Sequence, residues 1–104
     1  QKISTLLESS KTKCVIFSQT SCPFCVKAKE KLKELGATFD VVEIDTMPGT
    51  EGYAVRLELN EITGKSTVPS IFIDNKYIGG FTDGVERLEA EGILVDVLKA
   101  TGAL

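Results

Sequence analysis

The sequence has 104 residues, 42% of them hydrophobic, and its 12 basic and 15 acidic side chains give a net charge of −3. This composition is ordinary for a soluble domain with its own core, so we expect a single domain over residues 1–104. The charges are interspersed rather than clustered, and no apolar run approaches the roughly 18 residues of a membrane span, so neither nucleic acid nor membrane is an expected partner. The chain has three cysteines and no histidine, which excludes Cys–His protease chemistry and argues against an intrachain zinc site; no metal is expected.

Hydrophobic periodicity and turn residues predict nine elements in the order helix, strand, helix, strand, helix, strand, strand, helix, helix. A helix between the first two strands makes them parallel, and the turn Asp74-Asn75-Lys76 joins an antiparallel pair. We therefore expect an α/β fold, a three-layer sandwich whose central four-stranded mixed sheet is flanked by helices. The predicted elements cover residues 3–10, 14–18, 22–35, 39–44, 51–63, 69–73, 77–78, 83–91 and 93–100.

Particular residues are expected to orient these elements. The strand over residues 14–18 is apolar throughout, which predicts burial on both faces and makes Cys14 a small core residue. Leu59 and Ile62 are expected to turn the third helix towards the core. Asp83, or Thr82 before it, is expected to cap the following helix, because a glutamate follows three residues after Asp83 as in a capping box.

The motif that carries chemistry is Cys22-Pro23-Phe24-Cys25, which stands where the first strand gives way to the second helix. The first peptide N–H groups of a helix have no intrahelical partner, so a thiolate at Cys22 is stabilised relative to the thiol. Pro23 suits the first helical turn, where its missing N–H is no loss. Cys25 lies three residues on, along the same helical face, so the two sulfurs can meet as a redox pair.

Two further motifs accompany this one: the run Thr67-Val68-Pro69 that opens a strand, and Gly79-Gly80-Phe81-Thr82-Asp83 after the hairpin. A C-x-x-C motif beside a βαβ pattern is typical of thioredoxin-like redox proteins. With the other two motifs in register over nearly the whole chain, the sequence resembles a glutaredoxin of the dithiol class, which carries a C-P-[YF]-C site.

The resemblance implies a glutathione-dependent thiol–disulfide oxidoreductase with a thioredoxin-like fold. Cys22 alone would reduce glutathione mixed disulfides, and Cys22 with Cys25 would reduce protein disulfides through a redox-active disulfide. Glutathione would be the reductant and cosubstrate, glutathionylated and disulfide-containing proteins would be the partners, and the protein would act as a monomer. The order of the two cysteines supports these roles independently, because the first lies at the helix terminus and the second within the helix.

The resemblance also implies a glutathione site. The γ-glutamyl end would bind at Thr82 and Asp83, with Gly80 allowing close approach, and the backbone of Val68 would pair with the cysteinyl unit. Arg56 suits the glycyl carboxylate, whereas Gln19 replaces the lysine that the family usually has there. Pro69 corresponds to the family's cis-proline, and Phe24 and Phe81 replace the commoner tyrosine and cysteine. The complete predicted set is Gln19, Phe24, Arg56, Thr67, Val68, Pro69, Gly80, Phe81, Thr82 and Asp83.

Two alternative functions remain open at this point. A thioredoxin-type protein disulfide reductase would use the same chemistry, although that family usually has Trp-Cys-Gly-Pro-Cys and this chain has no tryptophan. A dimer that holds an iron–sulfur cluster between two Cys22 thiolates and two glutathiones is a second alternative, disfavoured by Pro23, which stiffens the loop. The few cysteines indicate a reducing compartment, the cytoplasm, or a chloroplast or mitochondrion if a leader has been removed.

Overall fold

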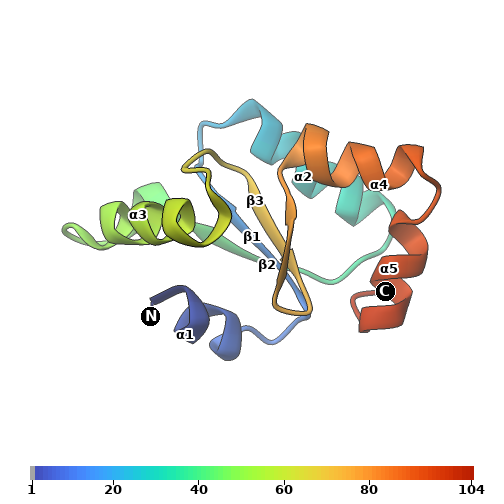
Figure 1. Ribbon diagram of the computed structural model, residues 1–104, viewed down its shortest axis with the longest axis horizontal. Coiled ribbons are helices and arrows are strands. Elements are labelled where there is room, and N and C mark those ends of the chain that lie inside the picture. Colours follow the sequence, from blue (N-terminus) through green and yellow to red (C-terminus); the bar gives the residue numbers. More distant parts are fainter. Residues whose placement is uncertain (1) are drawn as a thin grey trace.

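The computed structural model describes residues 2–104 and has the predicted order of elements (Figure 1). The expectation of nine helices and strands is met, with two short additional helices of other types. The elements are α1 (Lys2–Ser9), β1 (Cys14–Ser18), α2 (Pro23–Glu34), β2 (Asp40–Glu43), the 3-10 helix η1 (Ile44–Thr46), α3 (Glu51–Thr63), β3 (Ser70–Ile73), β4 (Lys76–Gly79), the π-helix η2 (Phe81–Glu86), α4 (Arg87–Ala90) and α5 (Leu94–Thr101).

The four strands form one mixed sheet in the order β2-β1-β3-β4. Strand β1 runs parallel to β2, with Ser18 opposite Glu43, and antiparallel to β3. Strand β4 returns antiparallel to β3 through Asp74 and Asn75, whose φ angles of 52° and 66° are those of the two-residue turn that hairpins favour. The expected parallel pair and hairpin are both confirmed, and β1 lies in the interior of the sheet.

Helices cover both faces of the sheet, which gives the predicted three layers (Figure 1). Because side chains alternate along a strand, Cys14 and Ile16 of β1 face one way and Val15 and Phe17 the other. The first pair packs with α2, α4 and α5, through residues such as Leu32. The second pair packs with α1 and α3. All five residues of β1 are buried, so the strand is the middle of the core, and Cys14 is part of it.

The segment between β4 and α4 folds back tightly onto the sheet. A Cβ atom at Gly84 would lie only 2.9 Å from the carbonyl oxygen of Ile78 and the carbonyl carbon of Gly79, closer than real side chains come. Glycine at position 84 therefore lets the first turn of η2 pack directly on the end of β4. This contact holds residues 80–83 beside the start of β3, where the functional site is formed.

Two local predictions were wrong. Ile62 is 43% exposed, because it lines an open surface groove with Leu7 and Phe72, and the buried residues of α3 include Val55 and Leu59. The N-cap of the helix after β4 is Gly80, and neither Thr82 nor Asp83. That helix begins with a π turn, in which the N–H of residue 85 bonds to the carbonyl of residue 80, so it starts earlier than the capping-box pattern indicated.

Smaller differences lie at element ends and on the surface. Strand β2 is shorter than predicted, because Ile44 already belongs to η1. On α2, Lys29 and Lys31 are half-buried in ion pairs with glutamates of β2 and α4. No helix within residues 2–104 combines the length and apolarity that a bilayer crossing requires.

Candidate active site

Cys22 is the N-cap residue of α2, in the extended conformation, and Pro23 is the first helical residue, as predicted. The Cys22 Sγ atom accepts a hydrogen bond from the backbone N–H of Cys25 at 3.2 Å, which is one of the unpaired donors at the start of the helix. The same sulfur lies 3.7 Å from the carbonyl oxygen of Val68, to which its thiol can donate. The fold thus places a half-buried, accessible sulfur at a helix terminus.

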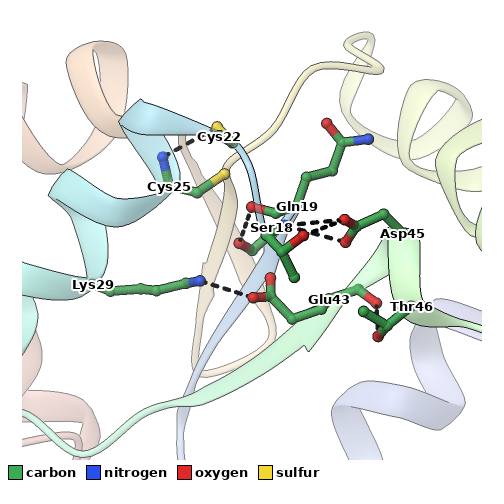
Figure 2. Close-up of polar contacts among 9 residues, drawn as sticks. Ser18, Gln19, Cys22, Cys25, Lys29, Glu43, Asp45 and Thr46 are labelled. Carbon is green, nitrogen blue, oxygen red and sulfur yellow. Dashed lines mark hydrogen bonds and ion pairs between the residues drawn. The ribbon is translucent and has the colours of Figure 1, made fainter.

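Cys25 lies one turn deeper and has no exposed surface (Figure 2). Burial raises the pKa of the Cys25 thiol, and its hydrogen bond with the Cys22 sulfur acts in the same direction. The backbone N–H of Gln19 and the hydroxyl of Ser18 oppose this shift, because both can donate to a Cys25 thiolate and so lower its pKa. In this structure the Ser18 hydroxyl donates to the carbonyl oxygen of Gln19 at 3.3 Å. Both cysteines are free thiols, so the structure represents the reduced form of the pair.

The turn that precedes Cys22 is fixed by an aspartate from the neighbouring strand end. Both carboxylate oxygens of Asp45 accept from the backbone N–H of Thr20, at 3.2 and 3.3 Å, and one also accepts from the Thr20 hydroxyl at 2.5 Å (Figure 2). The hydroxyl bond is the main reason that the pKa of Asp45 lies below its usual range. Asp45 therefore anchors the loop that carries the reactive cysteine.

A polar cluster lies beneath α2, close to Cys25. Lys29 is one helical turn beyond Cys25 and forms an ion pair of 3.0 Å with Glu43 of β2 (Figure 2). Glu43 is opposite Ser18 in the parallel ladder, and residues opposite each other in a ladder share a face. The other carboxylate oxygen of Glu43, Oε1, is buried and has no hydrogen-bond partner among the described residues.

Beside Cys22 lies a cavity of about 150 Å³ that gathers most of the predicted site residues. The Val68–Pro69 peptide bond in its wall is cis, as expected from the resemblance. Phe24, whose side chain is half-exposed, faces Phe81 across a ring-centroid distance of 6.3 Å. The predicted residues that line this cavity are Phe24, Thr67, Val68, Pro69, Gly80, Phe81, Thr82 and Asp83, and two that were not predicted are Lys65 and Tyr77.

Both carboxylate oxygens of Asp83 are engaged at the rim of this cavity. Oδ1 accepts from the backbone N–H of Gly80 at 2.7 Å, and Oδ2 pairs with the ammonium of Lys65 at 2.7 Å. The hydrogen bond from Lys65 is the largest cause that lowers the pKa of Asp83, so the group is a carboxylate at neutral pH. No local pattern predicted this pair, because its members are 18 residues apart in the chain.

Gln19 and Arg56 lie outside this cavity. They line a second one, of about 300 Å³, together with residues of η1 and α3 such as Asp45 and Tyr53. The Nη1 of Arg56 donates to the carbonyl oxygen of Ser66 at 2.6 Å, one residue before Thr67. The structure therefore brings Gln19 and Arg56 together with each other, but not with the other predicted residues.

A helix-terminal dithiol beside a cis-proline, on a thioredoxin-like sheet, defines a thiol–disulfide oxidoreductase. The family model for glutaredoxin matches residues 14–78. The chain is 44% identical over 90 residues to glutaredoxin-C2 of Arabidopsis thaliana, covering 86% of this chain and 78% of that protein. It is 45% identical over 89 residues to a glutaredoxin of Solanum lycopersicum, covering 86% of this chain and 80% of that protein. The chain belongs to the glutaredoxin family.

Solved structures agree with this assignment. A buckwheat glutaredoxin–glutathione complex superimposes with a TM-score of 0.91 at 36% identity, over 100% of this chain and 90% of that chain. A wheat glutaredoxin superimposes with a TM-score of 0.88 at 39% identity, over 98% of this chain and 93% of that chain. The thioredoxin-like fold expected from the three motifs is thereby confirmed.

Proposed function

We propose that this protein is a glutathione-dependent thiol–disulfide oxidoreductase that reduces glutathione mixed disulfides. The observation that carries the proposal is the position of Cys22, whose sulfur lies at a helix terminus and 3.7 Å from a carbonyl in the wall of a cavity with a carboxylate at its rim. Membership of the glutaredoxin family and the likeness to a glutathione-bound buckwheat relative support it. They also favour this function over a thioredoxin-type reductase.

The reduction of a glutathione mixed disulfide uses Cys22 alone. Its thiolate attacks the glutathionyl sulfur of a mixed disulfide, a new Sγ–S bond forms, and the substrate protein leaves as a thiolate that takes a proton. A glutathione thiolate then attacks the glutathionyl sulfur on Cys22, which releases glutathione disulfide and restores the Cys22 thiolate. Each step breaks one S–S bond and forms another. One mixed disulfide and one glutathione are consumed, and one protein thiol and one glutathione disulfide are formed, so the exchange balances.

Protein disulfides require both cysteines. Cys22 attacks the substrate disulfide and forms a mixed disulfide, and Cys25, after losing its proton, attacks the Cys22 sulfur and releases the reduced substrate. The resulting Cys22–Cys25 disulfide is then reduced by two molecules of glutathione. The position of Cys25 one turn below Cys22, with its backbone N–H already on the Cys22 sulfur, supports this step.

The cavity residues are proposed to bind glutathione in the orientation that the family resemblance implies. Asp83 takes the γ-glutamyl ammonium, the backbone of Val68 pairs with the cysteinyl unit, and Thr67, Gly80 and Thr82 surround them. Gln19 and Arg56, which line the second cavity, are proposed to take the glycyl carboxylate. Arg56 already reaches the carbonyl of Ser66, which supports a position near Thr67. The side chains of Phe24 and Phe81 supply the apolar walls of the cavity.

We further propose that residues 1–104 act as a single domain and a monomer, on glutathionylated and disulfide-containing proteins in a reducing compartment. The small, odd number of cysteines supports the compartment, and the cytoplasm is the first choice, with a chloroplast or mitochondrion as the alternative. A rice relative is named as chloroplastic. Sedimentation of the protein at micromolar concentration tests the monomer, and cell fractionation tests the compartment.

A choice of reductants tests the proposed function. We expect a glutathionylated peptide to be reduced when glutathione, glutathione reductase and NADPH supply the electrons, and not when thioredoxin reductase and NADPH replace them. The same protein boiled before the assay controls for uncatalysed exchange. Exclusive use of thioredoxin reductase would contradict the proposal and identify a thioredoxin-type reductase instead.

A further inference from the structure

Glu43 is a partly buried carboxylate beneath α2, and the proposed mechanism gives it no role. Its Oε2 atom pairs with the ammonium of Lys29 at 3.0 Å, and the two side chains are 26% and 24% exposed. Its Oε1 atom is buried, and no donor within residues 2–104 forms a hydrogen bond to it. Buried polar atoms of native proteins are nearly always paired, so an unpaired carboxylate oxygen beside a reactive cysteine pair requires an explanation.

Ser18 connects this carboxylate to Cys25. It lies directly opposite Glu43 in the parallel ladder of β1 and β2, so both side chains are on the face of the sheet that α2 covers. Its hydroxyl is close enough to the Cys25 sulfur to lower the pKa of that thiol. Lys29 follows Cys25 by one helical turn and reaches the same place. Figure 2 shows Ser18 between the side chains of Cys25 and Glu43.

The hydroxyl of Ser18 can pass a proton on, because a serine oxygen accepts one hydrogen bond while its O–H donates another. In the reduced protein this O–H donates to the carbonyl oxygen of Gln19 at 3.3 Å, a long bond for a hydroxyl donor and therefore a weak one. A rotation of the side chain releases it. Hydrogen bonds that transfer protons often become short only in the reacting complex, so the free protein need not show the complete chain.

We propose that Glu43 accepts the proton of Cys25 during the reduction of protein disulfides, acting through the hydroxyl of Ser18. This inference rests on the proposed function. As the Cys25 sulfur attacks, its bond to the Cys22 sulfur forms and the bond from Cys22 to the substrate breaks, with the electron pair leaving on the substrate sulfur. The Cys25 proton passes to Ser18 while the Ser18 proton passes to Oε1 of Glu43. The carboxylic acid then loses its proton to water and the substrate thiolate takes one up, so the step balances.

The surroundings of Glu43 suit this role better than those of the other nearby carboxylate. Lys29 holds Oε2, which leaves Oε1 turned inward, and the exposed quarter of the Glu43 side chain gives the proton a way out to solvent. Asp45 is the other carboxylate in Figure 2, and both of its oxygens already accept from the backbone N–H of Thr20. Cys22 is the remaining titratable group that faces Cys25, and it has no proton to exchange while it is joined to the substrate.

The pH dependence of the Cys25 step tests this assignment. A mixed disulfide between Cys22 and a peptide is trapped in acid, and release of the peptide thiol is timed after mixing to a series of pH values. If Glu43 takes the proton, the neutral thiol reacts, so below the pKa of Cys25 the rate should rise by less than about tenfold per pH unit. Glu43→Gln should slow the step by about tenfold at neutral pH, less than a base in direct contact supplies, and should make the rise tenfold. A tenfold rise in the unmodified protein would overturn the assignment without any variant.

Two further variants separate proton transfer from the loss of an ion pair. Lys29→Met breaks the same pair but keeps the carboxylate, so it should retain the shallow pH dependence. Glu89→Gln is the matched control, because it breaks an ion pair of 3.0 Å to Lys31, which is also a half-buried lysine of α2, and it should change neither the rate nor the slope. The same steep slope in Lys29→Met as in Glu43→Gln would overturn the assignment and leave the pair a structural tie between α2 and β2. Faster release in Glu43→Gln would also overturn it, because the carboxylate would then only repel the thiolate.

The reaction that uses Cys22 alone keeps this inference separate from the proposed function. Glu43→Gln should lose about tenfold more in the release step than in the reduction of a glutathionylated peptide, because the latter route leaves Cys25 protonated. Equal losses in both reactions would overturn the assignment, since the carboxylate would then support the fold of the whole site. Absence of glutathione-dependent turnover in the unmodified protein would instead refute the proposed function.

Discussion

Cys22 and Cys25 are the same residue type one helical turn apart, yet the fold gives them opposite surroundings. Cys22 is half-buried, caps α2 and lies beside a cavity, with a single backbone N–H on its sulfur. Cys25 is fully buried beneath it, against the end of β1. There the Ser18 hydroxyl and the backbone N–H of Gln19 partly offset the rise in its pKa. The two sulfurs therefore differ in their access to a substrate as well as in the groups that stabilise a thiolate.

The comparison shows how one motif provides two different thiols. The position at the helix terminus belongs to the first cysteine of a C-x-x-C motif, and the following turn carries the second cysteine onto the buried face of the helix. Burial raises the pKa of Cys25, so Cys25 keeps its proton until a mixed disulfide forms on Cys22. A protonated second cysteine does not compete with Cys22 for the substrate, and this order of events allows both proposed routes.

The largest expected effect is the loss of Cys22. Replacing it by serine, Cys22→Ser, should lower the reduction of both glutathionylated peptide and protein disulfide by about a thousandfold or more, because a hydroxyl is not ionised at neutral pH. Steady-state turnover with glutathione reductase and NADPH measures this. Near-normal turnover of either substrate by the variant would mean that Cys25 acts as a first nucleophile, contrary to its burial.

Cys25→Ser should separate the two reactions. Reduction of a glutathionylated peptide should retain most of the original rate, since that route needs Cys22 alone. Reduction of a protein disulfide should fall to background, because no thiol remains to attack the mixed disulfide on Cys22. The two substrates are compared on the same preparation, which makes each the control for the other. If both activities disappeared together, the separate roles of the two sulfurs would be wrong.

The opposite surroundings of the two cysteines could be predicted because they follow from local sequence. The end of the apolar run at Ser18, the proline after Cys22 and the three-residue spacing to Cys25 all lie within one stretch of chain, and each acts on its neighbours. The same holds for the hairpin at Asp74, whose turn residues tolerate positive φ. These parts of the fold are correct because periodicity and turn chemistry decided them.

What could not be predicted depends on contacts between distant segments. Lys65 meets Asp83 only because the tight packing of η2 on β4 places residues 80–83 beside the segment before β3. Ile62 has the spacing of a core residue, but whether a helical position is covered depends on what lies opposite, and there a groove remains. Gly52 illustrates the same limit: a Cβ at this position would lie 2.3 Å from the carbonyl oxygen of Ile44, a contact invisible in the sequence.

Selective alkylation tests the comparison of the two thiols without mutation, with Cys14 as a third case. At neutral pH we expect iodoacetamide to modify Cys22 first and Cys25 much more slowly, because Cys25 is fully buried and its raised pKa lowers its thiolate fraction. Burial raises the pKa of Cys14 to about 12, so Cys14 should react only after unfolding. Raising the pH towards 9 should speed the reaction of Cys25, because its thiolate fraction grows. Peptide mass spectrometry after timed quenching measures all three sites.

The urea-unfolded protein is the control for that experiment, since all three thiols are then exposed and should react at similar rates. Comparable rates for Cys22 and Cys25 in the folded protein would remove the difference between them. Fast reaction of Cys14 in the folded protein would indicate that β1 opens and would contradict its place in the core.

The smallest expected effect concerns the hydroxyl of Ser18, which lowers the pKa of Cys25. Ser18 is fully buried and its hydroxyl lowers the pKa of Cys25, so Ser18→Ala should raise that pKa further and reduce the thiolate available to attack the mixed disulfide on Cys22. A typical intramolecular hydrogen bond contributes about 0.5–1.5 kcal/mol, so the attack should slow by roughly two- to tenfold at neutral pH. Its rate should recover at higher pH, because a raised pKa is overcome as the pH rises through it. Single-turnover release of substrate thiol measures this step.

Ser70→Ala is the matched control for Ser18→Ala. Ser70 is the other fully buried serine among the described residues, and its hydroxyl donates to the carbonyl of Thr67 at 3.0 Å rather than to a cysteine. Both variants lose a buried hydroxyl and should lose similar stability, but only Ser18→Ala should shift the pH dependence of the Cys25 step. The Cys22-only reaction with a glutathionylated peptide should be unchanged in Ser18→Ala, because that route never ionises Cys25. An equal slowing of both reactions would mean that Ser18 supports the loop as a whole, and the chemical difference between the two sulfurs would then come from burial alone.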